Sequence, residues 1–251
     1  GLGDIDFRLT DFLADPETSQ MDYTEDLIYL PKGFLCFLPP NLSISVEEAP
    51  CLSQGKVTFG SFNALPKINP NVISLWIEIL QKEENSQLLL KNKSFSDSSV
   101  RHYFLELFTK NGIDESRLIF LPPNKDDKEH LMTYHRVDIS LDTFPYNGTT
   151  TTCESMWMGV PCVTLVGDQH RGRVGKSLLH QVECQELIAN TSQEYIDICV
   201  ELGENHKRTA SLRKGLREKL LTSPLCNTRY FSEIFDYLYG KMWQDYCDGK
   251  S

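Results

Sequence analysis

One short stretch of the sequence carries the residues best suited to chemistry. Residues 148–154 hold a glycine, four consecutive threonines, a cysteine and a glutamate. Gly148 lets the backbone turn tightly, and Thr149, Thr150 and Thr151 bring hydroxyl and N–H groups to the start of a predicted helix, where the helix dipole favours an anion. Because consecutive β-branched residues form helices poorly, the run predicts an anion site. The alternative is a threonine N-cap with the other threonines buried or solvated.

Glu154 lies one helical turn beyond Thr150. A carboxylate there can complement the helix dipole, or it can accept hydrogen bonds from the two hydroxyls of a ribose. The stretch has neither the Gly-x-Gly-x-x-Gly pattern of nicotinamide-binding folds nor the Gly-Lys-Ser/Thr pattern of a P-loop. Both of those nucleotide-binding classes are therefore excluded.

A lysine follows the first regular strand of the sequence. Lys67 lies between a β-rich run and a helical segment that has Pro70 near its start. An ammonium group at such a turn can offer a point charge to a diphosphate. The alternative for a lone lysine is a solvated surface side chain.

Two further turns carry groups that can bind phosphate or a base. His130 opens a predicted helix, where it could stack on a base, bond a phosphate or cap the helix at the surface. The turn that begins at Gly167 brings together Arg171, Arg173 and Lys176. In an acidic chain this basic cluster indicates a second anion contact, for which Arg173 is the candidate, or else a solvated face.

The elements that must position these residues alternate along the chain, which is typical of an α/β fold. Short apolar runs predict strands at 56–61, 88–91, 117–121, 137–141, 161–166 and 186–189. Helical periodicity predicts helices at 71–80, 97–110, 128–135, 150–158, 174–182, 192–221 and 228–243. This order predicts a Rossmann-like, doubly wound parallel sheet covered on both faces. Such sheets bind ligands beyond the carboxyl ends of their strands, where strand order reverses, and each candidate residue follows a strand.

Residues 1–55 differ from the rest because five prolines interrupt them. Within them, residues 23–29 suggest a short helix. We predict that 1–55 is a connector or the trailing part of a preceding domain, and that 56–251 form the ligand-binding lobe with C-terminal helices. The chain begins at Gly1 rather than Met, which suggests a fragment of a longer protein.

Composition narrows the function classes. The 251 residues include 25 basic and 35 acidic side chains, a net charge of −10, and 40% are apolar. The apolar fraction excludes a disordered chain, and the charge argues against nucleic acid or anionic membranes as partners. No apolar run approaches the roughly 20 residues that span a bilayer. The eight scattered cysteines, without a metal-binding spacing, favour a reduced cytoplasmic or nuclear protein.

From the residues alone, the sequence predicts a nucleotide or nucleotide-sugar half-site. Several segments also resemble the SPINDLY-type protein O-glycosyltransferases and, more distantly, the O-linked N-acetylglucosamine transferases. The similarity runs over nearly the whole chain, and the threonine run that ends in Glu154 is its most specific part. The segments that carry it are residues 59–70, 138–154, 157–161 and 223–226.

The resemblance implies the C-terminal, donor-binding lobe of a GT-B glycosyltransferase, in which two Rossmann-like lobes hold a nucleotide sugar. It implies inverting transfer of a sugar to Ser or Thr of proteins, with fucose from GDP-fucose favoured and UDP-N-acetylglucosamine as the alternative donor. A second alternative is a non-catalytic module that binds nucleotide sugar. We expect no cofactor and no metal, and we expect an N-terminal catalytic lobe and tetratricopeptide repeats in the full-length protein.

The resemblance also implies roles for individual residues. Lys67 matches a lysine that neutralises the diphosphate leaving group, and His130 matches a histidine near the base and diphosphate. Thr150 and Thr151 match a pair that contacts phosphate. Glu154 stands where the N-acetylglucosamine enzymes have an aspartate on the ribose.

Two positions depart from the pattern of this group. Ala64 stands where relatives carry an Asn or Gln that donates a hydrogen bond. Asp127 replaces a basic residue found near the donor in the N-acetylglucosamine enzymes. The hydrogen bond made by the residue at position 64 in relatives is therefore not expected here, and Asp127 weakens a direct transfer of the donor specificity of the N-acetylglucosamine enzymes.

Overall fold

The larger part of the molecule is built on a parallel sheet whose strands lie in its interior. The computed structural model describes residues 3–249, and among these the main sheet has the strand order β5-β4-β3-β6-β7-β8. The central strands are buried along their whole length, which explains why they read as unbroken apolar runs. The strands are β3 (Val57–Ser61), β4 (Ser86–Lys91), β5 (Leu118–Leu121), β6 (Ile139–Leu141), β7 (Cys162–Leu165) and β8 (Ile188–Ala189).

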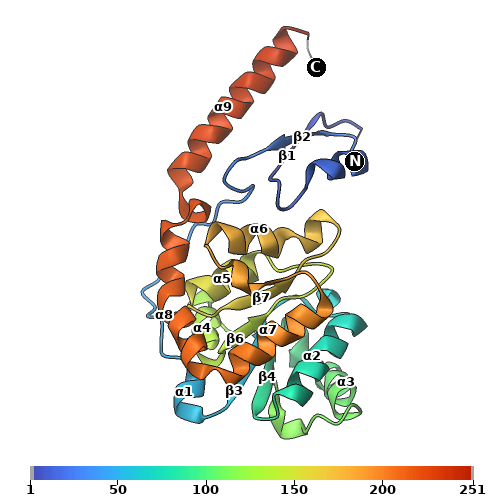
Figure 1. Cartoon of the computed structure of the whole chain (residues 1–251), viewed down its shortest axis with the longest axis vertical. Coiled ribbons are helices and arrows are strands. Elements are labelled where there is room, and N and C mark those ends of the chain that lie inside the picture. The colour runs from blue at the N-terminus through green and yellow to red at the C-terminus, as the bar shows by residue number, and fades with distance from the viewer. Residues whose placement is uncertain (1–2, 250–251) are drawn as a thin grey trace.

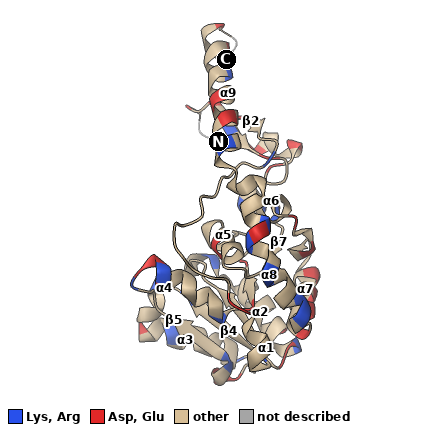
Figure 2. Ribbon diagram, turned by 90° about the vertical axis from the view of Figure 1, so that its left-hand side faces the viewer, with Lys and Arg blue, Asp and Glu red and all other residues tan. Residues whose placement is uncertain are grey.

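Strand order reverses in the middle of this sheet. β3 pairs with both β4 and β6, so the chain runs outward to β5 on one side and later to β8 on the other. Right-handed crossovers then place the helices of the two halves on opposite faces, as Figures 1 and 2 show. The predicted doubly wound, Rossmann-like sheet is confirmed. The crossover helices are α2 (Pro70–Lys82), α3 (Ser98–Thr109), α4 (Asp127–Met132), α5 (Thr150–Trp157) and α6 (Val174–Gln181).

The crossover helix α2 shows how the sequence fixes one helix of this lobe. Its N-cap, Asn69, accepts hydrogen bonds from the N–H groups of Asn71 and Val72, at 2.9 and 3.2 Å. Pro70 occupies the first turn, where a missing N–H costs nothing. One face of the helix is apolar and buries Trp76 completely. This helix therefore holds the turn that precedes it, which contains Lys67, against the sheet.

The helices at the C-terminus differ from their prediction in one respect. The predicted helix over 192–221 is two helices, α7 (Ser192–Glu204) and α8 (His206–Thr222), because Asn205 ends the first and caps the second through the N–H of Arg208. α9 (Thr228–Cys247) buries none of its residues among those described. It extends away from the sheet, alongside the N-terminal segment (Figure 1).

The N-terminal segment contains a second, smaller sheet. β1 (Phe7–Thr10) and β2 (Asp26–Tyr29) pair in parallel, with the 3-10 helix η1 (Glu17–Asp22) between them. The helix predicted over 23–29 is wrong, because β2 occupies its second half. The helix α1 (Pro50–Gln54) then leads into β3. The proposed division of the chain at residue 55 stays a prediction. Residues 1–2 of the first predicted part and 250–251 of the second lie outside the described residues.

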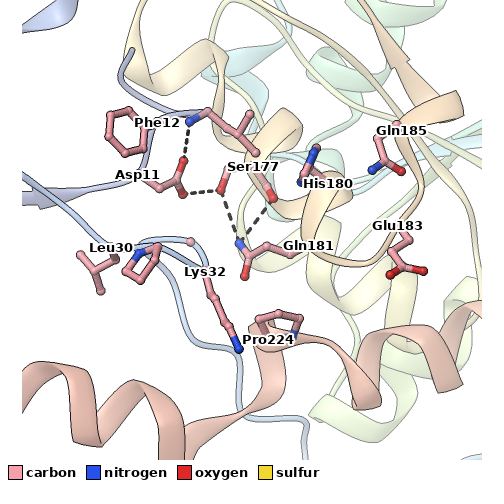
Figure 3. Close-up of a pocket in the computed structure, with 13 residues that line it drawn as sticks. Asp11, Phe12, Leu30, Lys32, Ser177, His180, Gln181, Glu183, Gln185 and Pro224 are labelled. Carbon is pink, nitrogen blue, oxygen red and sulfur yellow. Dashed lines mark hydrogen bonds between the residues drawn. The ribbon is translucent and has the colours of Figure 1, made fainter. Parts of the chain in front are cut away.

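The N-terminal segment is joined to α6 by a buried carboxylate. Asp11 accepts a hydrogen bond from Ser177 Oγ at 2.6 Å (Figure 3). It accepts others from the N–H groups of Leu13, Ala14 and Phe34. A cavity of about 470 Å³ lies beside this contact. Because Asp11 already has its full set of protein donors, we interpret this place as a structural junction.

Other features of the described residues bear on the composition arguments. All eight cysteines are free, and burial raises the pKa of the Cys51 thiol to about 12. Acidic and basic residues are interspersed along the ribbon, and residues of both signs occur near α4 (Figure 2). In the part of the chain that the structure describes, no helix is both long and apolar enough to span a bilayer.

Candidate functional site

Two loops that are far apart in the sequence meet at the centre of the sheet. Lys67 follows β3, and its Nζ donates to the backbone oxygen of Asn147, which follows β6, at 2.8 Å. The ammonium group also lies 3.9 Å from the centre of the Tyr146 ring. Burial lowers the pKa of Lys67, and the nearby Asp142 opposes that shift. The amine predicted to neutralise a diphosphate therefore reaches the turn that leads into α5.

A buried carboxylate shapes this turn from below. Asp142 is fully buried, and its Oδ1 accepts from the N–H of Gly148 at 2.6 Å and from the N–H of Thr143 at 2.9 Å. Its Oδ2 accepts from Thr164 Oγ1 at 2.7 Å. Burial raises the pKa of Asp142 to about 6, although these hydrogen bonds and Lys67 oppose the rise. Asp142 therefore fixes where Gly148 sits.

The start of α5 is open to an incoming group. Among the described residues no side chain caps the helix at Thr149, so its first N–H groups keep their donor capacity. Thr150 is exposed, and Thr149 and Thr151 are half-buried. A Cβ on Gly148 would lie 2.5 Å from Thr151 Oγ1, so the turn packs closely against the helix. The arrangement fits an anion, because free amides and the positive end of the helix dipole point the same way.

The threonines of α5 have separate tasks. Thr151 Oγ1 donates to Asn63 Oδ1 at 3.0 Å, which ties the helix start to the segment after β3. Thr152 is buried. The hydroxyls of Thr149 and Thr150 and the backbone amides are therefore free to contact an anion. The contacts of Thr149, Thr150 and Thr151 with a nucleotide sugar stay predictions.

His130 and Glu154 form a second cluster on the same edge. His130 Nε2 lies 3.0 Å from Glu154 Oε2, and the Tyr134 hydroxyl lies 3.4 Å from the same oxygen. On its other side, His130 Nδ1 lies 2.7 Å from the Nζ of Lys91, which ends β4. The structure thus brings two predicted site residues into contact and adds Lys91 to them.

A cavity of about 310 Å³ opens beside this cluster. It lies beyond the carboxyl ends of β3, β4 and β5, where a doubly wound sheet binds its ligands. Its lining combines aromatic, amide, basic and acidic groups, namely Phe62, Lys91, Asn92, Lys93, Pro123, Asn124, Lys125, Asp126, Asp127 and His130. This composition suits a planar polar group such as a nucleobase.

Arg173 lies at the other end of the site. Its Nε donates to the Leu13 oxygen at 3.0 Å and its Nη1 to the Gly167 oxygen at 3.5 Å. Nearby, His170 Nδ1 lies 2.7 Å from the buried Asp15 of the N-terminal segment. The loop after β7 thus holds the N-terminal segment through both residues. The donor contact assigned to Arg173 stays a prediction.

Several residues of the site were missed by the sequence reasoning. Lys91 ends a predicted strand, and the rule that polar residues at the carboxyl end of a strand face the ligand singles it out. Asp142 was placed in the right segment without a role. Asn63 and Tyr134 gave no signal, since their contacts depend on tertiary packing. In the described residues, no group of three or more His, Cys, Asp or Glu is arranged to hold a metal; the expected absence of a metal stays a prediction.

The fold is that of one lobe of a GT-B glycosyltransferase. The solved Thermobaculum terrenum O-GlcNAc transferase mutant matches with a TM-score of 0.89 and 35% identity, over 98% of this chain and 46% of that one. The sucrose-phosphate synthase of Thermosynechococcus elongatus shares the fold at 15% identity, with a TM-score of 0.62, over 95% of this chain and 58% of that one.

The family follows from the sequence comparison. The sequence model described as Glycosyl transferase family 41 matches residues 37–235, and this chain belongs to that family. It is 43% identical, over 99% of its length, to the Petunia hybrida protein named "Probable UDP-N-acetylglucosamine--peptide N-acetylglucosaminyltransferase SPINDLY". The Arabidopsis thaliana protein of that name is 43% identical over the whole chain. The resemblance to SPINDLY-type proteins is confirmed. The chain spans 27% of the length of both relatives.

Proposed function

We propose that this chain is the donor-binding lobe of a protein O-glycosyltransferase, which transfers a sugar from a nucleotide sugar to Ser or Thr of proteins. The observation that carries the proposal is the meeting of the Lys67 amine with the turn before α5, 2.8 Å from the Asn147 oxygen. A cation and an uncapped helix start placed together suit a pyrophosphate. The names of the family 41 relatives support the same reaction class.

The chemistry proposed for this site is inverting substitution at the anomeric carbon. The acceptor oxygen forms a bond to that carbon while the bond to the diphosphate oxygen breaks, and negative charge grows on the leaving diphosphate. Lys67 and the first amides of α5 would stabilise that charge, as preorganised donors do in other enzymes. The acceptor proton and the acceptor itself would be handled by a further catalytic lobe, with tetratricopeptide repeats in the full-length protein.

For the donor, we propose GDP-fucose. Asp126 and Asp127 both line the cavity beside His130. Guanine presents a ring N–H and an amino group along one edge, so a carboxylate can accept from both, whereas uracil presents one N–H there. Asp126 already accepts from the N–H of Glu129 at 2.8 Å, which leaves Asp127 as the better placed acceptor.

UDP-N-acetylglucosamine is the second candidate donor, and the names of the relatives favour it. Titration of the purified chain with GDP and with UDP, followed by calorimetry, separates the two. We expect GDP to bind at least about tenfold more tightly. Tighter binding of UDP would reverse the donor assignment, and the absence of binding by both would contradict the donor-lobe proposal itself. Asp127→Asn should reduce the preference for GDP, with the exposed Asp168→Asn as control.

A non-catalytic nucleotide-binding module is the alternative from another class, and Ala64 at the exposed turn before Lys67 favours it. Transfer assays on the full-length protein decide between the two, since a module would bind the donor without turnover. A cytoplasmic or nuclear location is proposed with either function, and the free cysteines support it.

A further inference from the structure

Lys91 is a buried lysine whose amine is fully engaged at the edge of the site. The residue is 4% exposed and ends β4. Its Nζ lies 2.7 Å from His130 Nδ1, 3.3 Å from the His130 backbone oxygen and 3.4 Å from Thr133 Oγ1. A buried amine without such acceptors would be costly. Burial lowers the pKa of Lys91 to about 8, and Glu154 opposes that shift, so the amine holds its proton at neutral pH.

This contact determines where the imidazole ring carries its hydrogen. A lysine ammonium group has three donors and no acceptor, so the nitrogen that faces it must accept. Nδ1 of His130 is therefore the acceptor, and the neutral ring carries its hydrogen on Nε2. That hydrogen points at Glu154 Oε2, 3.0 Å away. The result is a directed chain of donors that runs from Lys91 through His130 to Glu154.

We propose that Lys91 is a positioning residue of the donor site: through His130 it orients the carboxylate of Glu154 toward the hydroxyls of a bound nucleoside diphosphate. The proposal rests on the proposed donor-binding function. Oε2 of Glu154 accepts the imidazole N–H at 3.0 Å, while the Tyr134 hydroxyl lies 3.4 Å from that oxygen and 3.2 Å from the Thr151 backbone oxygen, so Oε1 is left for the ligand. With the other tautomer, Nε2 would present a lone pair to the carboxylate, and Glu154 would be pushed out of this position.

The first measurement needs the wild-type chain alone. Two-bond ¹⁵N–¹H correlation spectra of ¹⁵N-histidine-labelled protein distinguish the two imidazole tautomers, and His130→Gln identifies the His130 signals. We expect a single tautomer with hydrogen on Nε2 at neutral pH. A His130 ring that carries its hydrogen on Nδ1, or exchanges between both forms, would overturn the proposal.

The second measurement compares three substitutions. Lys91→Met keeps an unbranched side chain, one atom shorter, and removes its donors. The His130 signals should then show mixed tautomers, and the dissociation constant for GDP should rise about tenfold, the size expected for one charged hydrogen bond. Lys91→Arg keeps a charged donor and should restore part of that loss. Lys93→Met, an exposed neighbour on the rim of the same cavity, should leave the His130 tautomer unchanged.

The outcomes separate this inference from the proposed function. An unchanged tautomer in Lys91→Met, or a GDP affinity within twofold of wild type, would overturn the role of Lys91 even if the wild type binds GDP. Failure of the wild type to bind either GDP or UDP would overturn the proposed function and with it the ligand part of this inference. If Lys91→Met does not fold, the wild-type tautomer and the GDP affinity of Lys91→Arg still test the proposal, because hydrogen on Nδ1 of His130 in the wild type would overturn it.

Discussion

The two halves of the site, the start of α5 and the cluster beside α4, hold their charged groups in different ways. At the start of α5, the helix amides are open, the Lys67 amine bonds a backbone oxygen, and the carboxylate of Asp142 lies buried beneath the turn. Beside α4, Lys91, His130 and Glu154 are bonded to one another in series. In the first half, the buried Asp142 carboxylate holds the backbone of the turn in place. In the second half, side chains orient one another through hydrogen bonds.

This difference indicates a division of labour. Backbone amides and a lysine suit the diphosphate, which GDP-linked and UDP-linked sugars share. Side chains around a cavity suit the ribose, which GDP and UDP share, and the base, in which they differ. Substitutions in the first half should therefore weaken binding of GDP and UDP alike, whereas substitution of a cavity residue that faces the base, such as Asp127→Asn, should change the preference between them.

The largest effect is expected from removing the Lys67 amine. Lys67→Ala in the full-length enzyme should lower the rate of sugar transfer about a hundredfold, because one preorganised donor to the leaving group is worth about 3 kcal/mol. A steady-state transfer assay measures this rate. Lys82→Ala, on the exposed far end of α2 where it pairs with Glu78, is the control. Unchanged transfer by Lys67→Ala would show that the two halves are not divided as proposed.

Asp142→Asn tests the buried support of the first half through pH. The folded-state pKa of about 6 lies above the ordinary value of 3.8, so the native state holds a proton that the unfolded state releases between those values. The stability of the wild type should therefore fall as pH rises through this window, by about 2 kcal/mol from pH 4.5 to 7.5.

Urea unfolding of both proteins at pH 4.5 and 7.5 measures this prediction. Because other groups titrate in both proteins, their contributions cancel in the difference, and Asp142→Asn should gain stability relative to wild type at the higher pH. The exposed Asp168→Asn provides the reference. A difference that is the same at both pH values would rule out the buried carboxylate as described.

Gly148→Ala probes the close packing of the turn. The new methyl would lie 2.5 Å from Thr151 Oγ1 and 2.8 Å from Thr152 Oγ1, so the helix start must shift, at a cost of about 1 kcal/mol. Thermal unfolding and calorimetry should show lower stability and weaker binding of both GDP and UDP. Gly215→Ala in α8, where a Cβ meets open space, should be neutral or stabilising. Equal behaviour of the two variants would remove the argument for a tight turn.

The smallest effect on nucleotide binding is expected from Arg173→Ala. Its guanidinium already donates to the Leu13 and Gly167 oxygens, so the GDP dissociation constant should change less than about threefold, in line with a partly exposed contact. Limited proteolysis near Leu13 should increase. A loss of GDP affinity beyond tenfold would place Arg173 in the first half of the site after all.

How far the sequence predicts this structure differs between its parts. All six strands of the main sheet can be predicted from the sequence, because buried parallel strands are continuous apolar runs. The site can then be sought in the turns that follow those strands. β2 was missed, because a short, partly exposed strand such as DLIY has the spacing of a helical turn. The break at Asn205 was missed, because the apolar spacing of α7 continues into α8. Within the site, Lys67 and the threonine run were found by position, whereas the roles of Lys91 and Asp142 depend on burial that a single sequence does not reveal.

Three hydrogen bonds join the turn after β3 to the turn after β6, and their partners are far apart in the sequence. The separations are 80 residues from Lys67 to Asn147, 75 from Asn69 to Phe144 and 88 from Asn63 to Thr151. Closing loops of that length costs chain entropy that local contacts do not repay. Each of these contacts joins a residue that follows β3 to one that follows β6, so none of them can form during synthesis until β6 and the turn after it have been made. The geometry around Lys67 therefore depends on pairs of residues that can meet only once both halves of the sheet are present.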